Sequence, residues 1–442
     1  MEEHGTVRIS QCMIVKNEEA NIQKALSWGR EIVWEQIVVD TGSTDRTVEL
    51  AEAMGARIYH FPWIDDFAAA KNFAISKCGG DWIAFLDADE VFAPGDERKL
   101  LTLLEQLHPT QADAVNTGLS QVDSQGNVSG AGSQIRVFRN RPGVGYIRRI
   151  HEQLAYMDGT TMRVADASQD IFILHSGYSG KIWEEKKVSR RNIDLISKEL
   201  EDHPESYEMM GYMGDEYYSA GNSEDAEPWY RKSIASLPPA VHERDQRTAV
   251  TFIYLMEIVG RGDCEEGEML DIYQKAVSYL PREADFDYNL GCYYMDRNDF
   301  SKGAHYLEQA LHKLEQYGCY NRAMKLVGNL EKCYENIALC YYRTGEPEKA
   351  VTWCAAVLKT NHYNMMTLCM LLKAFQGNSL SFPLKETIGF LQKLYDFNRL
   401  KDRLFLLRSS EEADCRELKD YLERFFTKEE LEHIRKVLGK EG

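Results

Sequence analysis

The sequence predicts an α/β domain with a mostly parallel sheet, followed by an all-α domain built from repeated helices. Over roughly the first 175 residues, short β-rich runs alternate with amphipathic helical segments. From about residue 181, helical patterns follow one another almost without a break. Short strands separated by helices are typical of a parallel sheet with helices on both faces.

The size and composition of the chain suit several domains with real cores. Its 442 residues are 44% hydrophobic, and the pattern changes predict domains at 1–180, 181–378 and 379–442. A formal net charge of −18 argues against a nucleic-acid-binding surface. The sequence shows no signal-peptide pattern and no apolar run long enough for a membrane span. Ten cysteines without C-x-x-C spacing favour reduced thiols and a cytoplasmic location.

The elements of the first domain follow in a regular order. The expected strands cover residues 7–15, 35–40, 56–62 and 81–87, and the expected helices cover 17–29, 43–55 and 65–79. Asn17 is the expected N-cap of the first helix. Ser43 or Thr44 is expected to open the second helix, and Gly55 to close it.

The second half carries a repeat with the tetratricopeptide spacing of about 34 residues. Small, aromatic and alanine positions recur in three segments, with a degenerate copy ending in "YQKAVSYLP" between the first two. The repeat positions are Gly214, Tyr217, Ala226, Tyr230 and Pro238; Gly291, Tyr294, Gly303, Leu307 and Ala310; and Ala338, Tyr341, Ala350 and Cys354. Generic helix hairpins are the alternative interpretation. The last 60 or so residues are expected to form helices that cap the array.

Four polar segments fall at strand ends or in the turns that follow them. They are "IVKNEE", "VVDTGSTDRT", "DDFAAAKNFA" and "FLDADE". Ligands of parallel sheets gather beyond the carboxyl ends of the strands, so these segments predict one shared crevice. Taken singly, Asp40 has an ordinary explanation as a turn former or cap, and Asn17 as an N-cap.

The acidic run after the fourth strand predicts a metal site. Asp87 and Asp89 are alternate residues at a strand end and can share one centre. Neighbouring ionised carboxylates repel each other unless a cation lies between them. A hard divalent ion, Mg²⁺ or Mn²⁺, suits carboxylate and phosphate oxygens. A solvated acidic loop is the alternative, and Glu90 receives no role.

These segments carry a resemblance. In order, spacing and strand context, "ISQCMIVKNEE", "IVVDTGSTDRT", "FAAAKNFAI" and "DWIAFLDADE" resemble the motifs of family 2 glycosyltransferases of the GT-A fold, over roughly residues 8–180. The resemblance implies a nucleotide-sugar donor, usually a uridine diphosphate (UDP) sugar, and transfer with inversion.

The resemblance also implies roles for individual residues. Asp40 would contact the uracil or ribose, and Asp87 the ribose or the water shell of the metal. Asp89 would bind the metal, and His175 in "ILHSGY" would be a further ligand. The full donor-binding set implied is Val15, Asn17, Glu18, Asp40, Ser43, Asp45, Lys71, Asp87 and Ala88.

The layout resembles the subgroup with a helical repeat tail, which includes sublancin-type peptide S-glycosyltransferases and lipopolysaccharide-core glucosyltransferase-like proteins. In that subgroup a His-Glu pair follows a glycine segment, as in "VGYIRRIHEQL" here. The likeness places His151 and Glu152 on the acceptor side, with Glu152 as first candidate for the base and His151 as its neighbour or substitute. A buried histidine and a surface glutamate are the alternative. The "QxxRW" motif of processive synthases is absent.

A basic cluster precedes this pair. Arg136, Arg139, Arg148 and Arg149 have two open interpretations. They can face the diphosphate or an acidic acceptor, or lie on a solvated edge strand.

The leading hypothesis is a metal-dependent glycosyltransferase that modifies Cys, Ser or Thr of a peptide or protein recruited by the repeats. The runner-up acts on a lipopolysaccharide or other cell-envelope saccharide. A third hypothesis is a non-catalytic repeat scaffold with a relic transferase domain. A homodimer is compatible with an exposed repeat tail.

Overall fold

The structure is a computed structural model that describes residues 7–123, 125–176, 190–262, 264–318, 324–376 and 382–432. The chain divides into two compact units, residues 1–222 and 223–442. The domain boundaries predicted after residues 180 and 378 lie outside the described residues.

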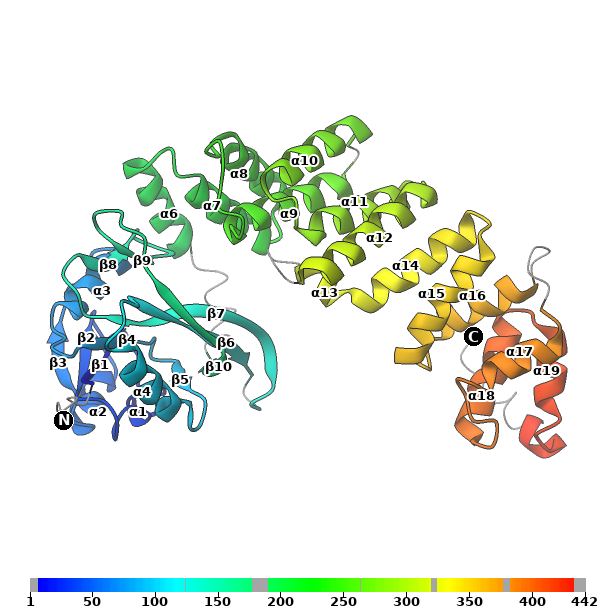
Figure 1. Cartoon of the computed structure of the whole chain (residues 1–442), viewed down its shortest axis with the longest axis horizontal. Helices are drawn as coiled ribbons and strands as arrows, with labels where there is room; N and C mark the ends of the chain where they lie inside the picture. The colour runs from blue at the N-terminus through cyan, green and yellow to red at the C-terminus, as the bar shows by residue number, and fades with distance from the viewer. Residues whose placement is uncertain are drawn as a thin grey trace. The chain divides into compact units, whose positions relative to one another are not determined.

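The first unit is built on an eight-stranded sheet with the strand order β3-β2-β1-β4-β7-β6-β10-β5 (Figure 1). Its strands are β1 (Ile9–Val15), β2 (Glu35–Asp40), β3 (Arg57–His60), β4 (Trp82–Phe85), β5 (Glu90–Phe92), β6 (Ala114–Val122), β7 (Val128–Arg139) and β10 (Val164–His175). Neighbours among β3, β2, β1 and β4 run parallel, and β7 joins β4 and β6 antiparallel. A separate hairpin pairs β8 (Val144–Ile147) with β9 (Gln153–Tyr156).

Helices cover both faces of the parallel part, as the sequence predicts. Alternate residues of β1 point to opposite faces. Met13 packs in one apolar cluster with residues of α1 (Ile22–Ser27) and α2 (Thr47–Ala53). Cys12 packs in another cluster with residues of α3 (Phe67–Ile75). A third cluster joins the sheet to α4 (Asp96–Leu107).

The four expected strands and three expected helices are all present, but two helix starts were predicted wrongly. Asn17 does not cap α1, which begins at Ile22. Its backbone is in the left-handed region with φ 57°, and its side chain accepts a hydrogen bond from the Thr44 amide instead. Helix α2 begins at Thr47, because Ser43 and Thr44 take part in these loop contacts.

Of the two interpretations left open for the arginine cluster, the solvated edge strand does not hold for Arg136 and Arg139. Strand β7 lies between β4 and β6 inside the sheet, and it buries Arg136 and Arg139. Antiparallel partners on both sides need no crossover helix, so the helix–strand alternation that marks the earlier strands is absent here.

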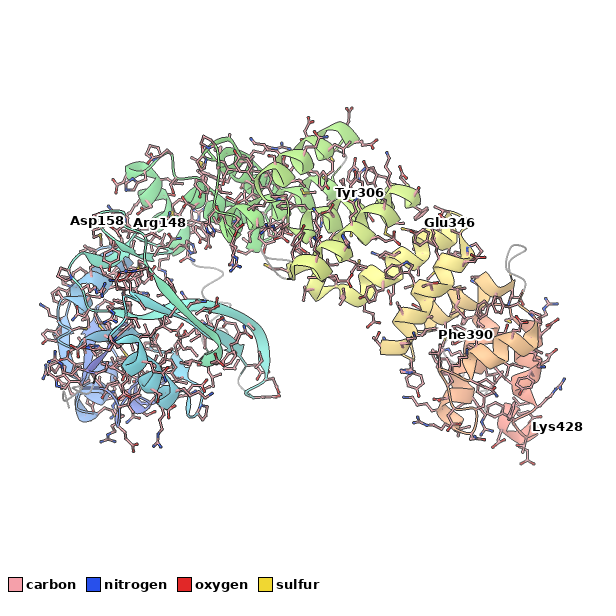
Figure 2. The ribbon with its side chains drawn as sticks, in the orientation of Figure 1. Arg148, Asp158, Tyr306, Glu346, Phe390 and Lys428 are labelled. Atoms are coloured by element: carbon pink, nitrogen blue, oxygen red, sulfur yellow. The ribbon has the colours of Figure 1, made fainter. Side chains whose placement is uncertain are left out.

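Two helices complete the first unit. They are α6 (Arg191–Asp202) and α7 (Tyr207–Ser219). Asp65, in the loop before α3, receives a bond of 2.5 Å from Lys198 of α6. The segment before β9 contacts α7, since Arg148, labelled in Figure 2, donates to Glu208 at 2.7 Å. These ion pairs tie both helices to the sheet domain.

The second unit is helical throughout its described residues. Its helices are α8 (Ser223–Ala235), α9 (Gln246–Arg261), α10 (Glu266–Tyr279), α11 (Ala284–Asp296), α12 (Phe300–Tyr317), α13 (Met324–Gly328), α14 (Leu330–Arg343), α15 (Pro347–Thr360), α16 (Met365–Gln376), α17 (Leu384–Leu391), α18 (Leu400–Glu412) and α19 (Arg416–Glu423). The repeat positions pack as expected: a Cβ at Gly291 would lie 2.8 Å from Leu307 Cγ. The repeat spacing therefore reflects close approach of α11 and α12.

Two further expectations concern cysteines and membranes. The nine cysteines within the described residues are all unpaired, as predicted. Across the same residues, the helices are too short or too polar to cross a membrane.

Candidate active site

The turns after β1 and β2 bind each other through side chains that the sequence singled out. The Asn17 amide donates to Ser43 Oγ at 2.9 Å, and the Thr44 amide donates to Asn17 Oδ1 at 2.8 Å. The Glu19 amide donates to Asp45 Oδ2 at 3.1 Å. Asn17, Ser43 and Asp45 therefore hold two loops together at the carboxyl edge of the sheet.

Asp40 at the end of β2 is buried and organises its own turn. Its carboxylate accepts hydrogen bonds from the Gly42 and Ser43 amides at 3.1 and 3.0 Å. Burial opposes ionisation, but these bonds lower the pKa of Asp40 below its ordinary value. A carboxylate held charged at a strand end is suited to accept hydrogen bonds from a ligand.

A buried cation from β7 balances part of the charge of the acidic run after β4. Arg136 of β7 donates to Asp87 Oδ2 at 2.6 Å and also to Glu90. Burial opposes the charge of Asp87, but Arg136 and Lys71 hold the pKa of that carboxyl well below its usual range. Glu90 is 1% exposed, and burial raises its pKa above the ordinary value. Glu90 thus anchors Arg136 and also accepts from the Asp87 amide at 3.0 Å.

Lys71 connects this run to the candidate base. The side chain comes from α3, is buried, and places Nζ 2.5 Å from Glu152 Oε1 and 3.7 Å from Asp87 Oδ1. Burial disfavours the ammonium ion, yet Asp87 and Glu152 raise its pKa above the ordinary value. Lys71 is therefore a permanent cation between two carboxylates.

Asp89 and His175 meet across the β5–β10 pairing. Glu90 lies opposite His175 in that register, and His175 Nε2 comes within 3.2 Å of Asp89 Oδ2. Burial opposes protonation, but the contact with Asp89 raises the pKa of the imidazole. Carboxylate oxygen and imidazole nitrogen fit a divalent ion whose other ligands come from a diphosphate. Within the described residues, no third His, Cys, Asp or Glu completes a protein-only metal cluster.

Glu152 and His151, the two candidates for the base, contact different partners. Glu152 reaches Lys71, whereas the His151 ring stacks on Tyr212 of α7 with centroids 3.7 Å apart. His151 also has a positive φ of 51°. The structure joins Glu152, and not His151, to the Lys71–Asp87 cluster.

The other arginines of the basic cluster bind within the domain and not at this cluster. Arg139 donates to the backbone carbonyls of Leu107, His108, Thr110 and Ala112. Arg149 pairs with Asp202 at 2.7 Å. Arg136 alone of the four contacts the acidic run.

Val15 and Ala88 are buried core residues. Both belong to the buried apolar cluster that covers α1 and α2. Sequence reasoning missed Tyr146, whose buried ring lies 5.0 Å below the Lys71 ammonium, and left Glu90 without a role. The short strands β8 and β9 gave no alternating pattern that would have marked Tyr146.

Comparison with known families identifies the domain. The family model described as glycosyl transferase family 2 matches residues 10–118. This chain carries a family 2 glycosyltransferase domain. The match contains Asn17, Asp40, Lys71, Asp87 and Asp89 and ends before Glu152 and His175.

Curated proteins similar to this chain match well beyond that region. A TPR repeat-containing protein of Synechococcus elongatus is 29% identical over 275 residues, covering 61% of this chain and 66% of the relative. The SPbeta prophage-derived glycosyltransferase SunS of Bacillus subtilis is 25% identical over 296 residues, covering 65% of this chain and 67% of SunS. The chain spans about two thirds of the length of these relatives.

Among solved structures, S. aureus TarS is 13% identical, with a TM-score of 0.35, covering 61% of this chain and 55% of TarS. The expected resemblance, a family 2 glycosyltransferase domain followed by a helical repeat region, is confirmed.

Proposed function

We propose that this glycosyltransferase transfers a sugar, with inversion and with the help of a divalent metal, from a UDP-sugar to a peptide or protein side chain. One observation carries the donor half of the proposal. The Asp89–His175 pair lies in the same strand-end region as Asp87, which Lys71 and Arg136 hold ionised. Carboxylates and an imidazole so arranged suit a metal-bound diphosphate.

Each part of the donor has candidate partners. Asp40 and the loops tied by Asn17, Ser43 and Asp45 would hold the nucleoside, and Glu18 lies in the same turn. Asp89 and His175 would hold Mg²⁺ or Mn²⁺. When bound, that ion supplies a positive charge that stabilises the departing diphosphate.

Glu152 is the proposed general base. The acceptor oxygen or sulfur forms a bond to the anomeric carbon while the bond from that carbon to the diphosphate breaks, and the acceptor proton moves to Glu152. Lys71 Nζ, 2.5 Å from Oε1, fixes the position of the carboxylate before that step. His151 is the less favoured candidate, because its ring is engaged by Tyr212.

Release of UDP tests the donor half. Wild-type protein with Mn²⁺ and a panel of UDP-sugars is expected to release UDP, and chelation or Asp89→Ala is expected to abolish the release. Asp170→Ala removes an exposed carboxylate from the strand that carries His175 and is the matched control. Metal-independent release, or full activity of Asp89→Ala, would refute the metal site.

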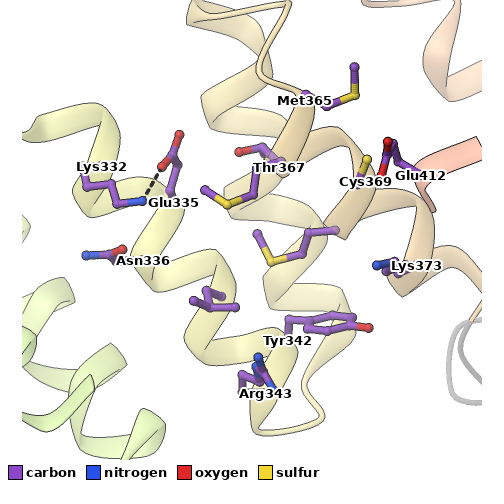
Figure 3. Close-up of a pocket in the computed structure, with 13 residues that line it drawn as sticks. Lys332, Glu335, Asn336, Tyr342, Arg343, Met365, Thr367, Cys369, Lys373 and Glu412 are labelled. Atoms are coloured by element: carbon purple, nitrogen blue, oxygen red, sulfur yellow. Dashed lines mark hydrogen bonds and ion pairs between the residues drawn. The ribbon is translucent and has the colours of Figure 1, made fainter. Parts of the chain in front are cut away.

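The acceptor half rests on a groove in the second unit. A cavity of about 460 Å³ opens between α14 and α16, with Glu412 of α18 at its side (Figure 3). Its lining is mainly apolar and includes Leu339, Tyr342, Met366 and Met370. Met366 is 59% exposed, which leaves an apolar surface for a partner.

Polar groups give this groove specificity. Thr367 is fully buried, and its hydroxyl has no hydrogen-bond partner among the described residues. In Figure 3 that hydroxyl points toward the side of Lys332 and Glu335. Arg343 and Lys373 also line the groove, and neither has a carboxylate partner within the described part of the chain. These features suit a peptide with apolar side chains, a carbonyl for Thr367 and at least one acidic residue.

Peptide recruitment is tested with Met366→Glu, which puts a charge on the apolar strip. Transfer to peptide acceptors is expected to fall. The control is Leu400→Glu, at a similarly exposed position outside the groove, and it is expected to have no effect. Thermal melting checks that both variants fold. Transfer to cell-envelope saccharides with equal efficiency in both variants would favour the saccharide acceptor instead.

A further inference from the structure

A second cavity lies in the first unit, beside the Lys71–Glu152 ion pair. Its volume is about 380 Å³. Ligand pockets begin at roughly 300 Å³, so this cavity is a small one. Its lining includes Lys71, Arg136, Tyr146 and Glu152. It has room for a monosaccharide but not for a whole nucleotide sugar.

Two buried donors in this lining have no hydrogen-bond partner in the part of the chain that the structure describes. Tyr146 is 5% exposed, and its hydroxyl has no hydrogen-bond partner within the described residues. The same holds for Nε of Arg136, whose terminal nitrogen binds Asp87 and Glu90. An unpaired buried polar group destabilises the folded state, so native structures rarely keep two together without a use for them.

The backbone and ring of Tyr146 are both held by neighbouring side chains. The Asn72 side chain accepts from the Tyr146 amide at 2.7 Å and donates to the Tyr146 carbonyl at 2.8 Å. A Cβ at Gly145 would lie 2.7 Å from Asn72 Oδ1, so glycine permits this close approach of β8 and α3. The ring also packs edge-on against Phe85 at 5.4 Å. Tyr146 is therefore rigid.

The charges around the cavity favour a neutral ligand. Lys71 is paired with Glu152, and Arg136 is paired with Asp87 and Glu90. Because each cation already has a carboxylate partner, an anionic ligand would meet no spare positive charge. The exposed side of the lining carries Ser133, Gln134 and Gln153, whose hydroxyl and amide groups suit a ligand rich in hydroxyls.

We propose that this cavity binds a neutral glycosyl unit and that Tyr146 donates a hydrogen bond to one of its oxygens, with Arg136 Nε as the second donor. The proposal rests on the proposed function, since it names the sugar class that the glycosyltransferase handles. Burial raises the pKa of Tyr146 to about 12, so the phenol keeps its proton at neutral pH. Uronates and sialic acids are disfavoured because of their carboxylates.

The test removes only the hydroxyl. Tyr146→Phe and wild-type protein are compared by calorimetric titration with UDP alone and with neutral UDP-hexoses, all with Mn²⁺. Loss of one hydrogen bond predicts about 3- to 10-fold weaker binding of UDP-hexoses and unchanged binding of UDP. The melting temperature is expected to stay the same or rise, because the hydroxyl has no partner to lose.

Two sources of the glycosyl unit are separable. Weaker binding of UDP-hexose by the variant assigns the cavity to the donor sugar. Unchanged UDP-hexose binding, with weaker binding of free methyl glycosides, assigns it to the sugar of a saccharide acceptor. If the variant changes neither affinity, the proposal is overturned.

A matched control removes a different hydroxyl from the same domain. Tyr156 Oη donates to the buried Asp113 at 2.9 Å and lies outside the cavity lining. Tyr156→Phe is expected to lower the melting temperature and leave the ratio of UDP-hexose to UDP affinity unchanged. Wild-type protein that binds neither UDP nor UDP-hexose would refute the proposed function. Binding by wild type with no selective change in Tyr146→Phe would refute only this inference.

Discussion

Lys71 Nζ lies 2.5 Å from Glu152 Oε1 and 3.7 Å from Asp87 Oδ1, although the three residues come from three separate segments of the chain. Lys71 belongs to α3, Asp87 follows β4, and Glu152 precedes β9. The ammonium thus links the candidate base electrostatically to the acidic run of the donor site. Loss of the ammonium would remove one partner from each of the two carboxylates.

Glu152→Gln tests the base. Loss of the Glu152 carboxylate is expected to lower the rate of UDP release from a UDP-sugar about 10²- to 10⁴-fold, which is the usual contribution of a general base. Calorimetric affinity for UDP with Mn²⁺ should be retained, because Glu152 is not among the proposed nucleotide contacts. Glu105→Gln on the exposed face of α4 is the control. An undiminished rate in Glu152→Gln would move the role to another group.

Lys71→Met tests the linkage through stability. Methionine is similar in length to lysine but lacks the ammonium. The substitution therefore leaves Glu152 without the partner observed here. Breaking a buried pair in this way is expected to lower the free energy of unfolding by about 3–5 kcal/mol. Urea unfolding followed by circular dichroism measures this change.

A double-mutant cycle separates the ion pair from simple loss of packing. In the Lys71→Met background, Glu152→Gln should lower the free energy of unfolding by less than it does in wild-type protein. The expected coupling energy is about 0.5–3 kcal/mol. Strict additivity of the two single variants would mean that the contact contributes nothing to stability.

The parallel half of the sheet was predictable from the sequence, whereas the antiparallel half was not. Strand β2 carries the apolar run 37–39 before Asp40, and β4 is apolar throughout. Helices separate these strands in the sequence. Strands β6, β7 and β10 include polar and small residues at many positions, and β5 has only three residues. Their pairing depends on contacts between residues far apart in the sequence.

The site residues on the parallel half of the sheet were also easier to predict from the sequence than those on the antiparallel half. Residues at the ends of predicted strands, such as Asp40 and Asp87, lie at the expected edge of the sheet. The pairing of Asp89 with His175 rested on the resemblance, because only the register of β5 with β10 brings these side chains together. Arg136 had two open interpretations, since a single arginine on a strand does not show which side is buried. No sequence signal distinguishes Tyr146 from an ordinary core aromatic.

Gly291→Ala tests the close approach of the repeat helices. The added methyl would lie 2.8 Å from Leu307 Cγ and 3.1 Å from the Leu307 amide nitrogen, so α11 and α12 must move apart. Overpacking of this kind is expected to destabilise the fold by about 1–3 kcal/mol. Gly389→Ala in α17 is the control, because a Cβ there meets nothing within 4 Å and alanine favours helix by about 0.5–1 kcal/mol. Equal melting temperatures for the two variants would contradict the prediction.

Asp285 predicts a pH dependence of stability in the second unit. Its buried carboxylate accepts from the Lys325 and Leu326 amides at 2.8 and 2.9 Å, yet burial raises the pKa of Asp285 to about 6. An unfolded aspartate has a pKa of about 3.9. Between these values the folded state holds a proton that the unfolded state has lost. Stability from this group is therefore greatest below about pH 4 and falls as the pH rises to about 6.

Asp285→Asn removes this titration while keeping one oxygen for the backbone amides. Two pKa units correspond to about 3 kcal/mol as an upper bound on the change in unfolding free energy. The difference in urea midpoint between wild type and Asp285→Asn is expected to shift in favour of the variant as the pH rises from about 4 to 6, and to stay constant above that. The other carboxylates are common to both proteins and cancel in the difference. Parallel pH profiles would show that Asp285 keeps an ordinary pKa in the folded chain.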